Sequence, residues 1–374
     1  MGQRTIVIVG GGIIGLSIAE ALTRRGLKPV IVEKGDFTRE ASWAGAGYLS
    51  LKAAALSGGP FFDLSVFSLR LYDQWVELLQ DESGIDIEFQ RGGHLEVALS
   101  PEEDAELKAQ ALKLQSSGVP VALLTGADAR AMEPNLSPKV VSAFQMPEGA
   151  QVRSPRLNRA ILKVLMKRNV QLRDQTPVNG FLTEGRRVVG VKTPAGEIRA
   201  EAVVLASGAW SGHLSDRLGL RLPVKPIRGQ VVLFTTAQPL LNRALFTPQA
   251  YLVPRLDGHM FIGSTFEDVG FNKGTTLEGV NYLEEAAYRA VPKLRLSRME
   301  SRWAGLRPGT PDGKPFLGPA PGIEGLVYAC GHQSHGILLA PATGVLIDQV
   351  LHGEEPDVPL EAFAANRSFE SPVG

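Results

Sequence analysis

Three glycines and one acidic residue near the start of the chain have the types and spacing of a nucleotide-binding site. Gly10, Gly12 and Gly15 follow the pattern G-x-G-x-x-G, and Glu33 comes roughly 20 residues after it. Gly10 permits a tight turn, Gly12 lets a pyrophosphate approach the backbone, and Gly15 lets a helix pack against a strand. Glu33 can accept hydrogen bonds from ribose hydroxyls and would repel a 2′-phosphate. The pattern predicts a dinucleotide with a free ribose, either NAD or FAD; the alternative is a glycine-rich turn without a ligand.

Regular elements on both sides of the glycines supply the context that this motif needs. Residues 6–9 form a short apolar run typical of a buried parallel strand. Apolar residues then fall at helical spacing from 14 to 25, and Gly26 is a typical helix stop. A second buried strand is expected at 30–32, with Glu33 at its end. The helix would point its free N–H groups and the positive end of its dipole at the phosphates.

Two further stretches combine small residues with the expected edge of a parallel sheet. Small residues dominate from Ala41 to Gly47, which favours a close-packed loop or helix start under a planar cofactor over a flexible surface linker. The apolar strand expected at 202–206 runs into Ser207–Gly212. Since ligands bind at the carboxyl ends of parallel strands, this second stretch is also expected to face the cofactor.

Along the rest of the chain, stretches with alternating strand and helix patterns are followed by stretches that resemble antiparallel strands. In addition, 374 residues exceed the usual size of a single hydrophobic core. We therefore expect an α/β fold with an α+β substrate part. In it, a Rossmann-type cofactor domain (1–55, 146–215 and 300–374) is interleaved with a substrate domain on an antiparallel sheet (56–145 and 216–299). Helices are expected at 61–79, 101–116 with Ser100 as N-cap, 283–290 and 337–351, and strands at 93–99, 176–178, 225–234, 250–255, 259–264 and 325–329.

Charge and cysteine content restrict the classes of partner and site. Lys plus Arg and Asp plus Glu are 39 each, so no nucleic acid partner is expected. The only cysteine, Cys330, excludes an intramolecular disulfide and a cysteine-based metal site, and no metal site is predicted. Without a signal-peptide pattern or a spanning apolar run, a cytoplasmic protein with no membrane span is expected.

Several longer motifs resemble one family, the flavin amine oxidases of the D-amino acid oxidase superfamily. They are G-G-G-I-I-G-L-S-I-A at the start, G-A-W-S-G at 208–212, Y-L-V-P-R at 251–255, W-A-G-L-R-P-G-T-P-D-G-K-P-F-L-G at 303–318 and G-I-L-L-A-P-A-T-G at 336–344. Within the superfamily, the likeness is strongest to the glycine oxidases of bacterial thiamine thiazole synthesis. It covers essentially the whole chain.

The resemblance implies FAD rather than NAD, held noncovalently because relatives with covalent flavin carry their cysteine near Gly305. It places Ile13 and Ile14 on the pyrophosphate, Glu33 on the ribose and the backbone of Val178 on the adenine. A helix start after the 331–336 loop is expected to give backbone N–H groups to the pyrimidine end of the flavin. The full set of implied cofactor-binding residues is Gly10, Gly12, Ile13, Ile14, Gly15, Glu33, Lys34, Ala41, Ser42, Ala46, Gly47, Tyr48, Val178, Gly208, His332, Gln333, Ser334, His335, Gly336, Ile337 and Leu338.

The resemblance also implies the residues that hold the substrate. Arg307 is expected to anchor a carboxylate with its guanidinium fork, the alternative being a structural ion pair. Tyr251 would donate its hydroxyl to the same carboxylate, or would pack in a sheet face. Ser334 and His335 stand where glycine oxidases typically carry Arg and Asn, and the loop leans toward the S-G-H-G type of sarcosine oxidases. His335 is expected either near the flavin as a catalytic group or as a residue that packs the loop.

These features predict FAD-dependent oxidation of a small amino acid or N-methyl amine, such as glycine, sarcosine or a small D-amino acid. Hydride passes to the flavin, the imine hydrolyses, and O2 takes the electrons and gives H2O2. The alternative is a secondary-amine dehydrogenase of the proline or hydroxyproline type that uses another electron acceptor. A third hypothesis is a flavin-binding partner subunit without turnover. A homo-oligomer is left open.

Overall fold

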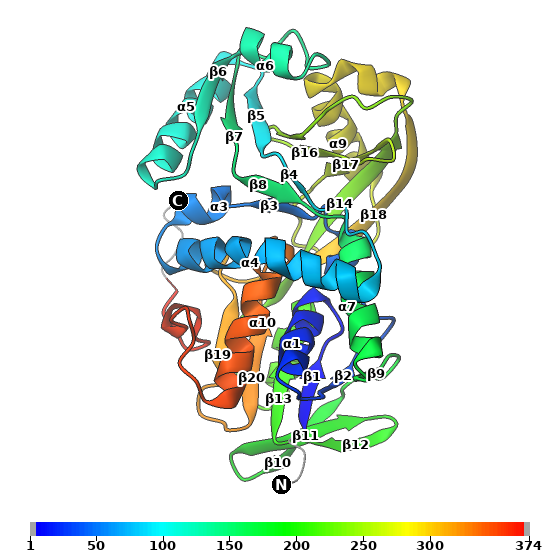
Figure 1. The fold of residues 1–374 in the computed structure, drawn as a ribbon, viewed down its shortest axis with the longest axis vertical. Coiled ribbons are helices and arrows are strands. Elements are labelled where there is room, and N and C mark those ends of the chain that lie inside the picture. Colours follow the sequence, from blue (N-terminus) through cyan, green and yellow to red (C-terminus); the bar gives the residue numbers. More distant parts are fainter. Residues whose placement is uncertain (1–4, 370–374) are drawn as a thin grey trace.

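The computed structural model describes residues 5–369 and contains two large β-sheets, each with its own helices. Figure 1 shows the α/β part below and the second part above, with the chain passing between them several times. The predicted fold class, a Rossmann-type domain combined with a largely antiparallel sheet, is confirmed. No helix in the described range is long and apolar enough to cross a membrane.

The first sheet has six strands and contains the predicted nucleotide-binding strand at its centre. The order is β19 (Phe316–Pro319), β20 (Leu326–Cys330), β13 (Ala202–Leu205), β1 (Ile6–Val9), β2 (Val30–Val32) and β9 (Gln171–Arg173). All neighbouring pairs are parallel except β19 with β20. The carboxyl ends of β1, β2, β13 and β20 therefore meet at one edge, where the structure can accommodate a ligand.

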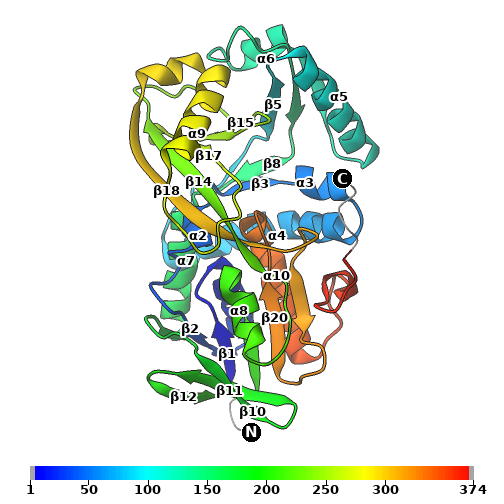
Figure 2. The same ribbon diagram turned by 180° about the vertical axis from the view of Figure 1, so that it is seen from behind.

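Alternating residues of β1 supply two separate cores, as expected for a strand buried on both faces. Ile6 and Ile8 pack against helices α1 (Ile13–Arg24), α4 (Pro60–Ser83), α7 (Ser154–Lys167) and α10 (Gly336–His352). Val7 and Val9 belong to a core shared with the meander β10 (Gly180–Glu184), β11 (Arg187–Thr193) and β12 (Gly196–Arg199). Figure 2 shows this second face, with α8 (Ser211–Asp216) over the sheet and the meander at its foot.

The second sheet has eight strands and covers the carboxyl edge of the first. Its order is β18 (Arg298–Gly309), β14 (Lys225–Thr235), β17 (His259–Gly263), β16 (Tyr251–Pro254), β15 (Ala244–Phe246), β5 (His94–Ala98), β7 (Ser142–Met146) and β6 (Ala122–Thr125). Only β15 and β5 run parallel. Helices α9 (Leu277–Ala290), α5 (Pro101–Ser116) and α6 (Gly126–Met132) accompany this sheet, and Ser100 caps α5 by accepting from the Glu103 amide at 3.2 Å.

Short elements connect the two sheets. A three-stranded sheet of β3 (Tyr48–Ser50), β8 (Gly149–Gln151) and β4 (Gln90–Arg91) lies between them (Figure 1). Helices α2 (Ala41–Ala44) and α3 (Lys52–Ser57) and the 3-10 turn Gly208–Trp210 are also connecting elements, whereas the 3-10 turn Pro292–Leu296 contacts α9 and the 3-10 turn Glu361–Phe363 contacts β19. The predicted domain boundary at residue 300 falls inside β18, which pairs with β14 along its length. The division into domains stays a prediction.

Candidate active site

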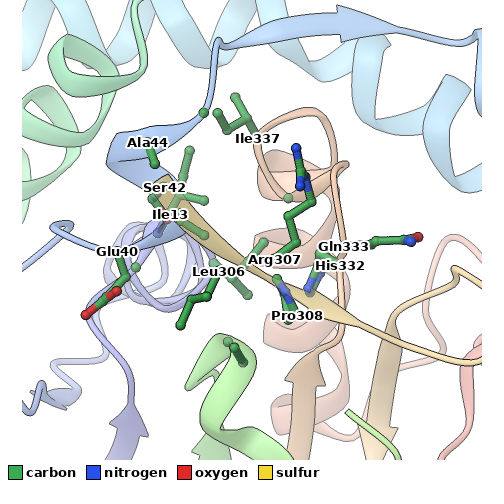
Figure 3. Close-up of a pocket in the computed structure, with 18 of the residues that line it drawn as sticks. Ile13, Glu40, Ser42, Ala44, Leu306, Arg307, Pro308, His332, Gln333 and Ile337 are labelled. Atoms are coloured by element: carbon green, nitrogen blue, oxygen red, sulfur yellow. Dashed lines mark hydrogen bonds between the residues drawn. The ribbon is translucent and has the colours of Figure 1, made fainter. Parts of the chain in front are cut away.

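A cavity of about 500 Å³ lies between the two sheets and collects nearly all the predicted site residues. Among the predicted residues, Gly15 alone does not line it. Figure 3 shows Ile13 and Ser42 on one side of this cavity and Arg307, His332 and Gln333 on the other. The volume lies in the range of small-molecule and cofactor sites, roughly 300–1,000 Å³.

The three motif glycines have the close contacts that the pattern predicts. Gly10 has φ +119°, and a Cβ there would lie 2.3 Å from the carbonyl oxygen of Ala206. A Cβ at Gly15 would lie 2.0 Å from the carbonyl oxygen of Gly10, so this glycine lets α1 pack against its own turn. Gly12 faces the cavity and would bring a Cβ within 3.2 Å of the Ser42 hydroxyl oxygen. A side chain at Gly12 would enter the phosphate cradle, whereas one at Gly10 or Gly15 would clash with the backbone.

Helix α1 begins at this cradle without a side-chain cap. The Ser42 hydroxyl accepts from the Ile13 amide at 2.9 Å, whereas the Ile14 and Gly15 amides find no acceptor in the described chain. Free amides at the start of a 12-residue helix are suited to bind an anion. Ser42 therefore lies beside the predicted pyrophosphate position.

Glu33 follows β2 and lines the same end of the cavity. Its carboxylate accepts from the Gly11 amide at 2.7 Å and from the Gly35 amide at 3.2 Å. A carboxylate has about four acceptor positions, so these bonds orient Glu33 and leave capacity for ribose hydroxyls. Lys34 also lines the cavity, but its ammonium group lies 3.2 Å from the centre of the Trp210 ring.

The small-residue loop after α2 forms one wall of the cavity. Gly47 has φ +74°, and a Cβ there would lie 2.2 Å from the carbonyl oxygen of Val152. The Arg255 guanidinium donates to the carbonyl oxygens of Ala46 and Val152, which ties the loop to the second sheet. The alternative of a flexible linker is therefore wrong for this segment, because its backbone is held on both sides.

Helix α10 points its first turn at the opposite end of the cavity. Gly336, Ile337 and Leu338 line the cavity, and their amides have no acceptor within residues 5–369. This second uncapped helix start has the geometry to hold a negative charge. The structure thus offers two anion-binding helix ends in one cavity, as a dinucleotide with an electron-rich ring would require.

The two histidines of the loop before α10 are neutral at neutral pH. Burial lowers the pKa of His332 to about 3, and its Nε2 lies 3.1 Å from the Thr343 hydroxyl oxygen. His335 faces the cavity, packs edge-on against Phe61 at 5.2 Å between ring centres, and has a pKa lowered to about 4 by burial. The geometry favours a packing role for His335 over a cationic one. Ser334 is exposed at the cavity rim.

Arg307 lines the cavity from β18 with a guanidinium that has only neutral partners. It donates to the Thr265 carbonyl oxygen at 3.1 Å and to the Ser264 hydroxyl, and it lies flat over Gly229, where a Cβ would be 2.2 Å from Nη1. Within the described residues, no carboxylate pairs with it. Burial lowers the pKa of Arg307 and Tyr251 raises it, but a guanidinium stays charged in a protein. The predicted alternative of an ion pair is therefore wrong.

Tyr251 lies on the same wall of the cavity. It faces Gly263 across β16 and β17, and a Cβ at Gly263 would lie 2.7 Å from the Tyr251 hydroxyl oxygen. Its ring stacks on Phe261, with ring centres 6.2 Å apart and an interplanar angle of 7°. Packing and cavity contact therefore coexist at Tyr251.

The sequence alone identified only Tyr48 of a polar group that lies beside β5 of the second sheet. The Tyr48 hydroxyl lies 2.8 Å from His94 Nδ1, and Lys52 pairs with Glu96; Tyr48, Lys52 and His94 all line the cavity. Burial raises the pKa of Tyr48 and lowers that of His94 to about 3. The available signal was the alternation of His94 and Glu96 in a strand expected to be half-buried, but their partners lie more than 40 residues earlier in the chain.

Two features limit the reactions that this site can support. In the part of the chain that the structure describes, no cluster of His, Cys, Asp or Glu has the geometry of a metal site. Cys330 lines the cavity, but burial raises the pKa of its thiol to about 12, so the thiolate is not available as a nucleophile. The donor set is instead that of a dinucleotide site with a cationic anchor at one end.

Comparisons with known proteins agree with this geometry. The family model described as DAO, FAD dependent oxidoreductase, matches residues 5–350. The chain is 39% identical to the glycine oxidase of Pseudomonas aeruginosa over 360 residues, which are 96% of this chain and 98% of that protein. It is 34% identical to the hydrogen cyanide synthase subunit HcnC of the same species, over 98% of this chain and 97% of that protein. The crystal structure of glycine oxidase from Geobacillus kaustophilus superposes with a TM-score of 0.94 at 33% identity, covering 98% of this chain and 100% of that one.

Proposed function

The chain belongs to the DAO family of FAD-dependent oxidoreductases, and from this premise we propose that it oxidatively deaminates a small amino acid or N-methyl amine. Glycine, sarcosine and small D-amino acids are the proposed substrates. The proposed products are the imine, which hydrolyses, and H2O2 from O2 as electron acceptor. The observation that carries the substrate class is the unneutralised guanidinium of Arg307 in the cavity.

The residues present fit FAD at both ends. Gly12, the uncapped start of α1 and Glu33 form a cradle for the pyrophosphate and the adenosine ribose. The amides of 336–338 would hold the pyrimidine edge of the ring system. The inert thiol of Cys330 supports noncovalent attachment. When bound, FAD supplies a hydride acceptor for the substrate α-carbon.

The chain's own residues bind and orient the substrate. Arg307 uses two of its five N–H donors on Thr265 and Ser264, so donors remain for a carboxylate. Tyr251 can add a hydroxyl donor from the same wall. An anchored carboxylate fixes the α-carbon relative to the cavity, which lowers the entropic part of the barrier. His335, uncharged at neutral pH, does not repel a protonated amine.

The proposed electron acceptor is O2. Relatives named as oxidases support O2. Ser334 is exposed at the position where glycine oxidases typically carry arginine, and we infer that this favours substrates with a substituted nitrogen. A dehydrogenase that reduces another acceptor is the second candidate, and it would form imine without a matching amount of peroxide.

Arg307→Lys tests the proposed anchor. Lysine keeps the charge but loses the bidentate fork, so the substrate concentration for half-maximal anaerobic flavin reduction should rise roughly 10- to 100-fold. The FAD content should stay the same. The matched control is Arg302→Lys, at an exposed position of the same strand outside the cavity. Equal behaviour of the two variants would remove Arg307 from the substrate site.

A further inference from the structure

Helix α10 is interrupted in its first turns by a proline. Pro341 has no N–H, so the carbonyl oxygen of Ile337, four residues earlier, loses its helical donor. The helix nevertheless continues to His352; residues 338–344 are buried, and Ile337 itself is half-buried. A buried carbonyl without a donor costs about 1–3 kcal/mol, so a donor from another element is required here.

Helix α4 supplies the missing hydrogen bond and adds two others to the same turn. The Tyr72 hydroxyl donates to the Ile337 carbonyl oxygen. The Ser68 hydroxyl donates to the Leu338 carbonyl oxygen at 2.6 Å and accepts from the Ala342 amide at 3.3 Å. Both side chains have 0% exposure. Figure 1 shows α4 crossing the start of α10, one face of which it covers. Two hydroxyls therefore bridge the backbone ladder that Pro341 breaks.

The bridged turn is the one that lines the cavity. The Ile337 carbonyl and the Leu338 amide belong to one peptide group: its oxygen bonds Tyr72, and its N–H has no acceptor in the described chain. A hydrogen bond to the carbonyl polarises the peptide and strengthens its N–H as a donor. Tyr72 and the bound cofactor would thus act on opposite ends of the same dipole.

We propose that Tyr72 and Ser68 are positioning residues for the flavin ring. They fix the first turn of α10 so that its free amides stabilise the negative charge of the reduced cofactor. This inference rests on the proposed function only in placing the ring at this helix start. It assigns a role to two side chains that lie outside the cavity lining.

The test removes each hydroxyl and measures the cofactor rather than turnover. In Tyr72→Phe holoenzyme, the Kd for FAD should rise roughly tenfold, because the half-buried Ile337 carbonyl loses its donor. The midpoint potential of the flavin should become more negative, because the reduced flavin loses more stabilisation from the α10 amides than the oxidised flavin does. Ser68→Ala should act in the same direction and carries the test if Tyr72→Phe does not fold.

Controls exist within the same protein. Ser65→Ala removes a hydroxyl that is equally buried on α4 but bonds its own helix at Phe61. Tyr288→Phe removes a hydroxyl that bonds Glu284 on α9. Neither control should move the potential. A potential that stays at the wild-type value in both Tyr72→Phe and Ser68→Ala would overturn the proposal.

Pro341→Ala provides a rescue, because it restores at residue 341 the N–H that can donate to the Ile337 carbonyl oxygen. In this background the effect of Tyr72→Phe on the potential should shrink several-fold. An undiminished effect would show that Tyr72 acts by another route and would overturn the proposal. If the Tyr72 and Ser68 variants leave the midpoint potential unchanged while the wild-type enzyme oxidises amines, only this inference is refuted. If the variants shift the potential but no amine reduces the wild-type flavin, only the proposed function is refuted.

Discussion

At the scale of single residues, charged side chains and glycines define the site. Their spatial neighbours come from distant segments and could not be predicted from the sequence. The Arg307 prediction came from a motif, but its neutral partners, Ser264 and Thr265, are contributed by the turn after β17. Gly229, which makes room for the guanidinium, lies on β14. The Tyr48–His94 pair was missed because its two residues are brought together only by the fold.

Glu33 is predicted to contribute charge to cofactor binding. Glu33→Gln keeps the shape but weakens the bonds from the Gly11 and Gly35 amides and those to the ribose, so the Kd for FAD should rise about tenfold. Fluorescence titration of the apoprotein measures this. Glu184→Gln, on the exposed edge of the meander, is the control. An unchanged Kd in Glu33→Gln would contradict the assigned role.

Two buried histidines, His94 and His332, and the half-buried His335 predict a loss of stability in mild acid. Burial lowers the pKa of His94 and His332 to about 3 and that of His335 to about 4, whereas all three ionise near 6.5 when unfolded. Near pH 5 the unfolded chain binds about three more protons, so the free energy of unfolding should fall by about 4 kcal/mol per pH unit. Burial lowers the pKa of His259, but its hydrogen bonds with carboxylates outweigh this and raise the pKa overall. Near pH 5, His259 is therefore protonated in both the folded and the unfolded chain.

Urea unfolding of the FAD-free protein between pH 7 and pH 5 measures this slope. His335→Gln removes one of the three groups and should make the slope shallower by about 1.4 kcal/mol per pH unit. Stability independent of pH across this window would mean that the histidines are not buried in the neutral form.

At the scale of elements, segments with strong hydrophobic periodicity were predicted correctly. Other strands form because they pair with distant strands, and these were not predicted. The helix 101–116 with its Ser100 cap is confirmed residue for residue. The strand β18 was not predicted, because Arg298–Gly309 is rich in charge and glycine and is held by its pairing with β14. The strand expected at 176–178 is wrong: Pro177 has no N–H for a ladder, and this segment lines the cavity instead.

The loop between α2 and β3 is predicted to tolerate no Cβ at Gly47. Gly47→Ala combines φ +74° with a contact 2.2 Å from the Val152 carbonyl oxygen, so it should abolish FAD retention and lower the yield of folded protein. Gly58→Ala is a matched control, with φ +71° and open space around the added methyl group. Because Gly58 has ψ −176°, a conformation that glycine almost alone adopts, the substitution should cost about 1–3 kcal/mol of stability. Equal effects would mean that backbone strain, not contact, is decisive.

At the scale of the whole molecule, the cavity joins two sheets that the chain visits alternately. Residues of β1 and β2 contribute one side and residues of β14, β16 and β18 the other. The two sheets could be expected from the alternating periodicities, but the pairing of β18 with β14 on both sides of the predicted boundary at residue 300 could not, because it depends on contacts between distant segments.

Cofactor binding is therefore predicted to stabilise both parts together. FAD at 100 times its Kd should add about 2.7 kcal/mol to the free energy of unfolding and raise Tm in a single transition. Calorimetry with and without FAD measures this. Two separate transitions, only one of them sensitive to FAD, would mean that the sheets unfold independently.

The most direct test of the account is anaerobic mixing of the purified holoenzyme with glycine, sarcosine, small D-amino acids and prolines. The account predicts that at least one small amino acid or N-methyl amine bleaches the visible absorbance of the oxidised flavin. Admission of O2 should then restore the absorbance and yield one H2O2 per imine formed. Bound flavin that none of these compounds reduces would contradict the account.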